Sequence, residues 1–137
     1  MESIELPPGG RLRFWPALIK PDKADHFMEV LISDLAWSQR SIRMIGRQVP
    51  QPRLTAFYGQ AGVEYRYSGL TWQALPWSGA LAELAKQVAE AAGFEFNSVL
   101  CNLYRDGQDS MGWHADDAPE LGTNPVIASV SFAQSRR

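Results

Sequence analysis

Apolar positions recur every three or four residues in two stretches of the chain, which is the spacing of one face of a helix. The first stretch follows Asp22, which we expect to cap the start of a helix, and the second follows Ser78 and ends at Gly93. Each predicted helix has one apolar stripe that we expect to be buried. The stripes are Ala24, Phe27, Met28, Leu31, Ile32 and Leu35 in the first helix, and Leu81, Leu84, Ala85, Val88 and Ala92 in the second.

Short runs of β-branched and aromatic residues predict strands elsewhere. Residues 54–58 and 63–67 flank a glycine-bounded loop, so we expect them to pair as a hairpin. Residues 94–104 predict a further strand, and residues 126–132, almost wholly apolar or small, predict a buried one. Prolines and glycines before the first helix predict a loop-rich lead-in with one extended piece at residues 12–15. The fold class is therefore α+β, with two helices supporting a sheet.

Length and composition narrow the class of protein. A chain of 137 residues forms one domain, and 45% hydrophobic with 20% charged residues is ordinary for a soluble globular protein. No apolar run reaches the ~18–20 residues that span a bilayer, and the first residues lack the basic segment followed by an apolar core that is typical of a secretion signal. We expect a monomer that does not contact membranes and is intracellular, cytoplasmic in a bacterium and with access to the nucleus in a eukaryote. The single cysteine, Cys101, excludes an internal disulfide.

Basic residues are concentrated in one segment. Between Leu35 and Val63 there is no acidic residue, although the net charge of the chain is -2. A solvated basic face is the commoner explanation for such a segment. The segment also suits a phosphate backbone, since apolar residues between the charges could enter between bases. The four arginines are Arg40, Arg43, Arg47 and Arg53.

The stretch from Ser98 to Asp117 has the candidate chemistry. It contains an extended segment, a polar turn, and a second extended segment that ends in H-A-D-D. Because residues two apart on a strand face the same way, Asn102 and Tyr104 share a face, and His114 and Asp116 can aim at one point. Such a pair supplies two ligands of a 2-His-1-carboxylate iron site. Without further context, however, His-x-Asp more often forms a surface ion pair.

The order of motifs along the chain favours an iron site over a surface ion pair. N-x-Y, a D-G turn, G-W-H-x-D-D and P-V-I-A-S-V-S-F follow one another. Together they resemble the AlkB family of Fe(II)- and 2-oxoglutarate-dependent dioxygenases, with particular likeness to the branch that repairs alkylated duplex DNA. The resemblance runs from about Phe14 to Arg136 and implies a double-stranded β-helix, or jelly roll, within a single domain, residues 1–137. In that domain 1–21 are the lead-in, 22–93 the helices and nucleotide-recognition lid, and 94–137 the first jelly-roll strands with the metal-site motif.

The resemblance implies roles for the residues of the iron motif. His114 and Asp116 would be catalytic ligands of Fe(II), and Asn102 and Tyr104 would hydrogen-bond the cosubstrate 2-oxoglutarate. Enzymes of this family use O₂ to hydroxylate an N-alkyl group on a base, and the product releases an aldehyde. Because that group is inaccessible within a duplex, the nucleotide must be flipped out.

The resemblance also implies how a nucleotide would be bound. Tyr65 and Tyr67, which on packing grounds alone are ordinary cross-strand residues, belong to a Y-x-[aromatic]-S-G motif that matches the family's lid. Met44-Ile45-Gly46 matches a finger whose tip, Ile45, would fill the gap left by the flipped base. Asp117 would accept a hydrogen bond from the exocyclic amino group of adenine or cytosine. The residues assigned to the substrate are Ile45, Arg43, Arg47, Tyr65, Tyr67, Ser68 and Asp117, and Tyr67 would stack on the base with the ring of His114.

The family's sheet continues past the S-V-S-F strand and then provides a second histidine and an arginine for 2-oxoglutarate. The only other histidine here, His26, lies off the apolar face of the first predicted helix and is expected at the surface. We therefore expect the C-terminal part of the jelly roll and of the site to be missing from these 137 residues. Three functions stay open: oxidative dealkylation of alkylated DNA, nucleic-acid binding without catalysis, and demethylation of RNA.

Overall fold

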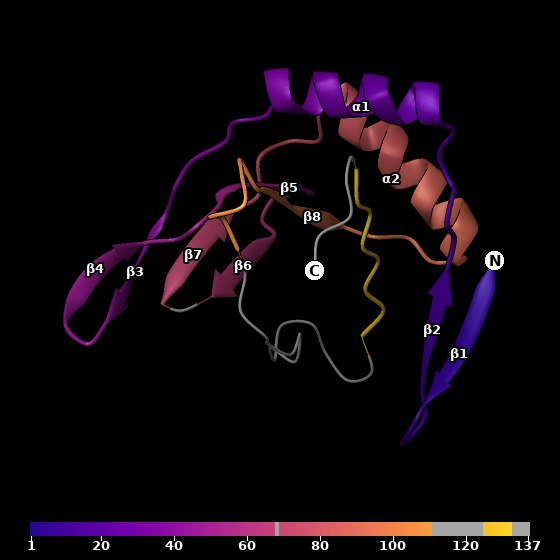
Figure 1. The fold of residues 1–137 in the computed structure, drawn as a ribbon, viewed down its shortest axis with the longest axis horizontal. Helices are drawn as coiled ribbons and strands as arrows, with labels where there is room; N and C mark the ends of the chain where they lie inside the picture. The colour runs from indigo at the N-terminus through magenta and orange to yellow at the C-terminus, as the bar shows by residue number, and fades with distance from the viewer. Residues whose placement is uncertain (68, 111–124, 133–137) are drawn as a thin grey trace.

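The structure is a computed structural model that describes residues 1–67, 69–110 and 125–132. Two helices lie over one side of a set of short antiparallel strands, and two hairpins project at opposite ends (Figure 1). The elements in chain order are β1 (Glu2–Leu6), β2 (Gly10–Phe14), α1 (Pro21–Asp34), β3 (Ser41–Met44), β4 (Arg47–Pro50), β5 (Leu54–Gly59), β6 (Glu64–Tyr67), β7 (Leu70–Gln73), α2 (Gly79–Ala92) and β8 (Ser98–Leu103). The combination of strands with two helices agrees with the predicted α+β class.

Helix α1 begins differently from the prediction. Its N-cap is Lys20, no side chain caps it, and Pro21 occupies the first turn with Asp22. Proline suits this position because it lacks the N–H that would have no partner there. The prediction that Asp22 is the cap was therefore wrong, although its charge still complements the helix dipole. The predicted stripe was also too wide, because Ile32 is 42% exposed.

Helix α2 has the predicted ends. The Ser78 hydroxyl accepts a hydrogen bond from the Leu81 backbone N–H at 3.2 Å. Gly93 ends the helix with a φ of 69°, a left-handed conformation that glycine adopts without steric cost. Both helices pack against β5. The buried core they share contains Phe27, Leu31, Leu35, Ala56, Tyr58, Leu81 and Leu84.

The pairing of β5 contradicts the predicted hairpin. Strand β5 pairs with β8, from Leu54 opposite Leu103 to Gly59 opposite Ser98, and β6 pairs with β7 instead. The prediction followed the shorter loop, but β5 is buried along nearly its whole length and needs a partner that also packs under the helices. Gly59 permits this pairing, since a Cβ there would lie 2.6 Å from the Asn97 carbonyl oxygen.

Two further predictions differ from the described structure. The lead-in forms an exposed β1–β2 hairpin, although only its second strand was expected. Residues 125–132 form no strand, and Val126, Ile127 and Val130 are exposed. An apolar run favours burial, but a strand also needs a neighbour for its backbone hydrogen bonds. Phe132 packs against Phe27, with ring centroids 6.3 Å apart.

The described strands form four separate two-stranded sheets, so they do not establish the predicted jelly roll. Of the helices in the described residues, none has the length and apolar character needed to cross a membrane. His26 is exposed on α1, as predicted.

Candidate functional site

The β3–β4 hairpin forms a finger with an isoleucine at its turn. Met44 pairs with Arg47, so only Ile45 and Gly46 make the turn, with φ angles of 49° and 73°. A two-residue hairpin turn of this kind needs left-handed residues, which suits glycine but costs a β-branched side chain about 1–2 kcal/mol. The side chain of Ile45 is 100% exposed, so burial does not offset that cost. Neither folding nor packing therefore explains an isoleucine at this turn.

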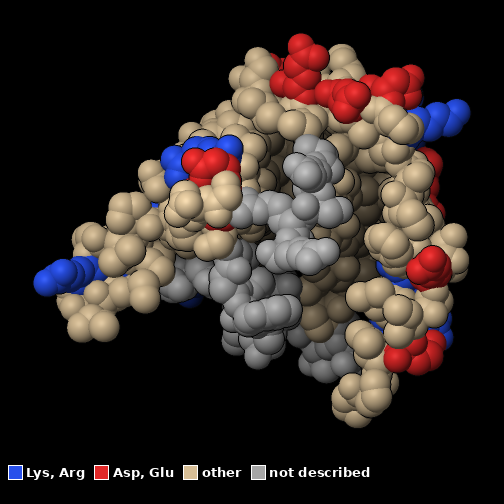
Figure 2. All heavy atoms as spheres, in the orientation of Figure 1, with Lys and Arg blue, Asp and Glu red and all other residues tan. Residues whose placement is uncertain are grey.

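The finger is basic on its exposed surface. Arg43 and Arg47 are both exposed, and the hairpin contains no acidic residue. In Figure 2 the outer end of the hairpin shows basic side chains, whereas acidic side chains gather over α1. A chain of net negative charge thus has a local basic projection, which is the distribution that attracts a polyanion.

The other two arginines of the basic segment are engaged within the fold. The Arg40 guanidinium lies 5.0 Å from the centroid of the Trp72 ring. Arg53 is only 4% exposed, and its Nε donates a hydrogen bond to Asn102 Oδ1 at 3.0 Å. Of the four arginines, Arg43 and Arg47 therefore remain the exposed candidates for phosphate contact.

The tyrosines of the predicted lid lie on β6. The Tyr65 ring packs between Phe57 and Trp72, with centroid distances of 5.8 Å and 5.7 Å. Cross-strand packing therefore accounts for its position, and these contacts also hold its ring in place. Tyr67 pairs with Leu70 in the backbone register. Ser68 lies outside the described residues.

Asn102 and Tyr104 lie at the end of β8. Asn102 is exposed and sits opposite Thr55 of β5, and Tyr104 is half-buried just after the strand. Because the Arg53 guanidinium has only donors, it engages the oxygen of Asn102, and the amide nitrogen keeps its N–H donors for another partner. Such donors fit an anionic oxygen ligand.

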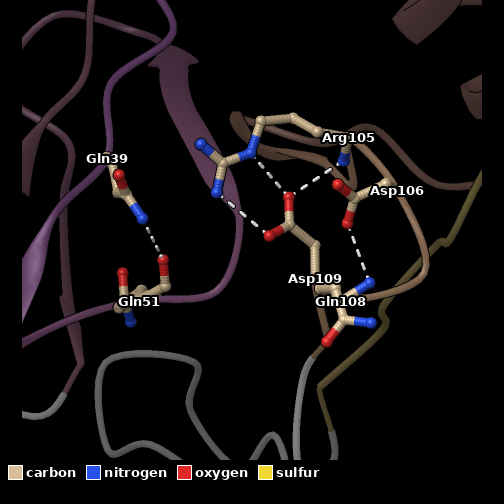
Figure 3. A network of polar contacts seen from close by, with 6 residues as sticks. All are labelled: Gln39, Gln51, Arg105, Asp106, Gln108 and Asp109. Carbon is tan, nitrogen blue, oxygen red and sulfur yellow. Dashed lines mark hydrogen bonds and ion pairs between the residues drawn. The ribbon is translucent and has the colours of Figure 1, made fainter.

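The polar turn after β8 is held by a buried carboxylate. Asp109 is 5% exposed and accepts hydrogen bonds from the Arg105 backbone N–H at 2.9 Å, Nε at 2.7 Å and Nη2 at 3.0 Å (Figure 3). Asp106 Oδ1 accepts from the Gln108 backbone N–H at 2.8 Å. The hydrogen bond to Asp109 raises the pKa of Arg105 above its ordinary value, so the guanidinium stays charged. The turn immediately precedes the iron motif.

The predicted metal ligands His114 and Asp116, together with Asp117, lie outside the described residues. Within 1–67, 69–110 and 125–132 there is no group of three or more His, Cys, Asp or Glu side chains that could hold a metal ion. Burial raises the pKa of Cys101 to about 11, so this thiol is protonated at neutral pH.

Sequence reasoning missed the structural roles of two residues of this region. Arg53 follows a proline in a basic segment, and nothing in its neighbourhood distinguishes a buried arginine from an exposed one. Asp109 had a usable signal, since it lies four residues after Arg105 across a D-G turn, a spacing that allows an ion pair.

The chain is similar in sequence to known dioxygenases. A family model described as the 2OG-Fe(II) oxygenase superfamily matches residues 11–137. The alpha-ketoglutarate-dependent dioxygenase alkB homolog 3 of Rattus norvegicus is 43% identical in an alignment 137 positions long, which covers 98% of this chain and 46% of the rat protein. The human protein of the same name is 42% identical over the same share of this chain and 47% of its own length. DNA oxidative demethylase ALKBH2 of Mus musculus is 38% identical over 115 residues, 84% of this chain and 48% of the mouse protein. The chain thus spans about half the length of these curated relatives.

Proposed function

Because the chain belongs to the AlkB family of 2-oxoglutarate- and Fe(II)-dependent dioxygenases, we propose that it contributes to oxidative removal of N-alkyl groups from bases in DNA. The relatives are named as an alpha-ketoglutarate-dependent dioxygenase and a DNA oxidative demethylase. The observation that carries the nucleic-acid part of the proposal is Ile45, an exposed isoleucine held at the left-handed turn of a basic hairpin.

His114 and Asp116 would hold Fe(II), and Asn102 and Tyr104 would bind 2-oxoglutarate. The donor chemistry of Asn102 supports this assignment, since its N–H groups suit a carboxylate or keto oxygen. Tyr104, half-buried just after the same strand, is assigned to 2-oxoglutarate by the family resemblance. When bound, iron and 2-oxoglutarate would activate O₂, which is the oxidant for hydroxylation of the N-alkyl group of the base.

The finger would act on the duplex. Extraction of a nucleotide costs a few kcal/mol, and less when an alkyl group has already disturbed its pairing. Ile45 would occupy the space that the nucleotide leaves, and Arg43 and Arg47 would contact phosphates on either side. The extracted base would be bound by Tyr67 and Tyr65. Ser68 would line the same pocket, and Asp117 would select bases with an exocyclic amino group.

An anaerobic titration tests the iron and cosubstrate site in this chain. Addition of Fe(II) and 2-oxoglutarate should produce a visible metal-to-ligand absorption band. Asp116→Ala should abolish the band, whereas the matched variant Asp117→Ala should keep it, because Asp117 is assigned to the base. Absence of the band in the unmodified chain would refute a working site within these 137 residues.

Nucleic-acid binding without catalysis is a second candidate function. The observation that favours it is the basic finger, which is complete within the described residues. This function predicts salt-sensitive binding to methylated oligonucleotides that does not change in His114→Ala. Parallel titrations with DNA and RNA oligonucleotides of one sequence distinguish the two nucleic acids as substrates.

A further inference from the structure

A buried arginine lies between the finger and the candidate cosubstrate strand. Arg53 is 4% exposed and directly precedes β5. Burial of a guanidinium, which cannot lose its proton, is costly unless hydrogen bonds replace its water. A neutral residue would avoid this cost, so the charge and the donor geometry of Arg53 need an explanation beyond packing.

The contact with Asn102 explains why an arginine is useful at this position. An amide can present either its oxygen or its nitrogen to a ligand, and an exposed asparagine can rotate between the two. Arg53 Nε lies 3.0 Å from Asn102 Oδ1, and the guanidinium offers donors only. The reversed amide would bring N–H groups against N–H groups. Arg53 therefore selects the orientation in which Asn102 presents donors.

Arg53 is itself held on several sides. Its backbone N–H donates to the Gln51 carbonyl oxygen at 2.8 Å, and the Gln51 backbone N–H donates to the Arg40 backbone carbonyl oxygen at 2.7 Å. The Gln39 amide points to the same Gln51 carbonyl at 2.9 Å (Figure 3). The Pro52 carbonyl accepts from the Ser110 N–H at 2.8 Å. These bonds join the base of the finger to the turn before the iron motif, so the backbone position of Arg53 is determined by the fold.

We propose that Arg53 is a positioning residue for the cosubstrate, which acts by holding the Asn102 amide with its N–H donors toward an oxygen of 2-oxoglutarate. The inference rests on the proposed function of Asn102. Arg53 does not touch the cosubstrate in this role, so its effect passes through Asn102 alone.

Calorimetric titration of the full 137-residue chain with 2-oxoglutarate, in the presence of Zn(II) in place of Fe(II), tests the proposal. Arg53→Met should raise the Kd of 2-oxoglutarate about tenfold, the effect of one misoriented hydrogen bond to a charged group. Arg53→Lys, which keeps a charged donor, should recover part of that loss. The control Arg40→Met removes a neighbouring arginine that packs on Trp72 and should bind as the unmodified chain does.

A double variant separates positioning from a general structural role. If Arg53 acts through Asn102, Arg53→Met combined with Asn102→Ala should bind no more weakly than Asn102→Ala alone. Additive losses would overturn the proposal, and so would equal binding by Arg53→Met and the unmodified chain. Either of these results would overturn the role of Arg53 without contradicting the proposed function. If the unmodified chain does not bind 2-oxoglutarate, both the role of Arg53 and the proposed function are overturned.

A measurement on the unmodified chain decides the question where a variant does not fold. In NMR spectra, the side-chain amide protons of Asn102 should shift when 2-oxoglutarate is added, and the Arg53 Nε–H should stay protected from exchange. Unshifted amide protons, or an Arg53 Nε–H that exchanges as fast as those of Arg43 and Arg47, would overturn the proposal.

Discussion

Replacement of Ile45 by asparagine should make the folded chain more stable and, at the same time, weaken its binding to nucleic acid. Ile45 has a φ of 49°, in the left-handed region that β-branched residues rarely adopt. Its side chain is 100% exposed, so the substitution removes no buried apolar contact. Asparagine tolerates this conformation well. The two properties should therefore change in opposite directions.

The expected gain in stability follows from the backbone conformation of Ile45. The left-handed conformation costs a β-branched residue about 1–2 kcal/mol, and asparagine avoids most of this cost. A gain of about 1 kcal/mol corresponds to a rise in melting temperature of roughly 3–6 °C for a domain of this size. Differential scanning calorimetry measures it. Val49→Asn is the matched control, because Val49 lies in β4 of the same hairpin without a positive φ, and loss of its β-branched side chain should lower stability.

The second part of the test measures how strongly Ile45→Asn binds nucleic acid. Fluorescence anisotropy with a duplex that contains one methylated base should show about tenfold weaker binding by Ile45→Asn, since an apolar side chain no longer enters the stack. The salt dependence of binding should not change, because Arg43 and Arg47 remain. A melting temperature that is unchanged or lower in Ile45→Asn would refute the strain argument. Unchanged affinity would refute the role of Ile45 in the duplex.

Three further predictions concern the charged and titratable groups. Arg43→Gln and Arg47→Gln should each reduce the slope of log K against log salt by about 1, measured by anisotropy at several salt concentrations, and an unchanged slope would exclude the residue from phosphate contact. Asp109→Ala should lower the urea midpoint more than Asp109→Asn, which keeps one acceptor for Arg105; equal effects would mean that the hydrogen bonds of the turn contribute little to stability. Cys101, with a pKa raised from 9.0 to about 11, should react with iodoacetamide at pH 8 about 100-fold more slowly in the folded chain than in urea, because fewer thiols are ionised. Since the unfolded thiol ionises first as pH rises, stability should fall between pH 9 and 11, and Cys101→Ala should remove that part of the loss.

Sequence periodicity and capping predicted the elements whose causes are local. The core stripe of α2 and its two ends depend on residues within the helix itself, and the turn at Ile45 and Gly46 lies where the motif predicted a finger tip. The pairing of β5 with β8 could not be obtained in this way, because it depends on which strand can share burial under the helices. The burial of Arg53 could not be predicted either, since its partner Asn102 lies 49 residues away.

The buried polar residues of the described chain are concentrated at one end of β5. They are Gln51, Arg53, Thr55 and Asp109, whereas the core under the two helices is apolar apart from the Tyr58 hydroxyl. Three buried polar atoms, Gln51 Oε1, Thr55 Oγ1 and Trp72 Nε1, make no hydrogen bond within the described structure. Each such atom costs stability, so a fold selected for stability alone would place apolar side chains there. Thr55 lies directly opposite Asn102 in the β5–β8 pairing, so part of this cost falls at the strand end where the cosubstrate is proposed to bind, which is where preorganised donors have a use that offsets it.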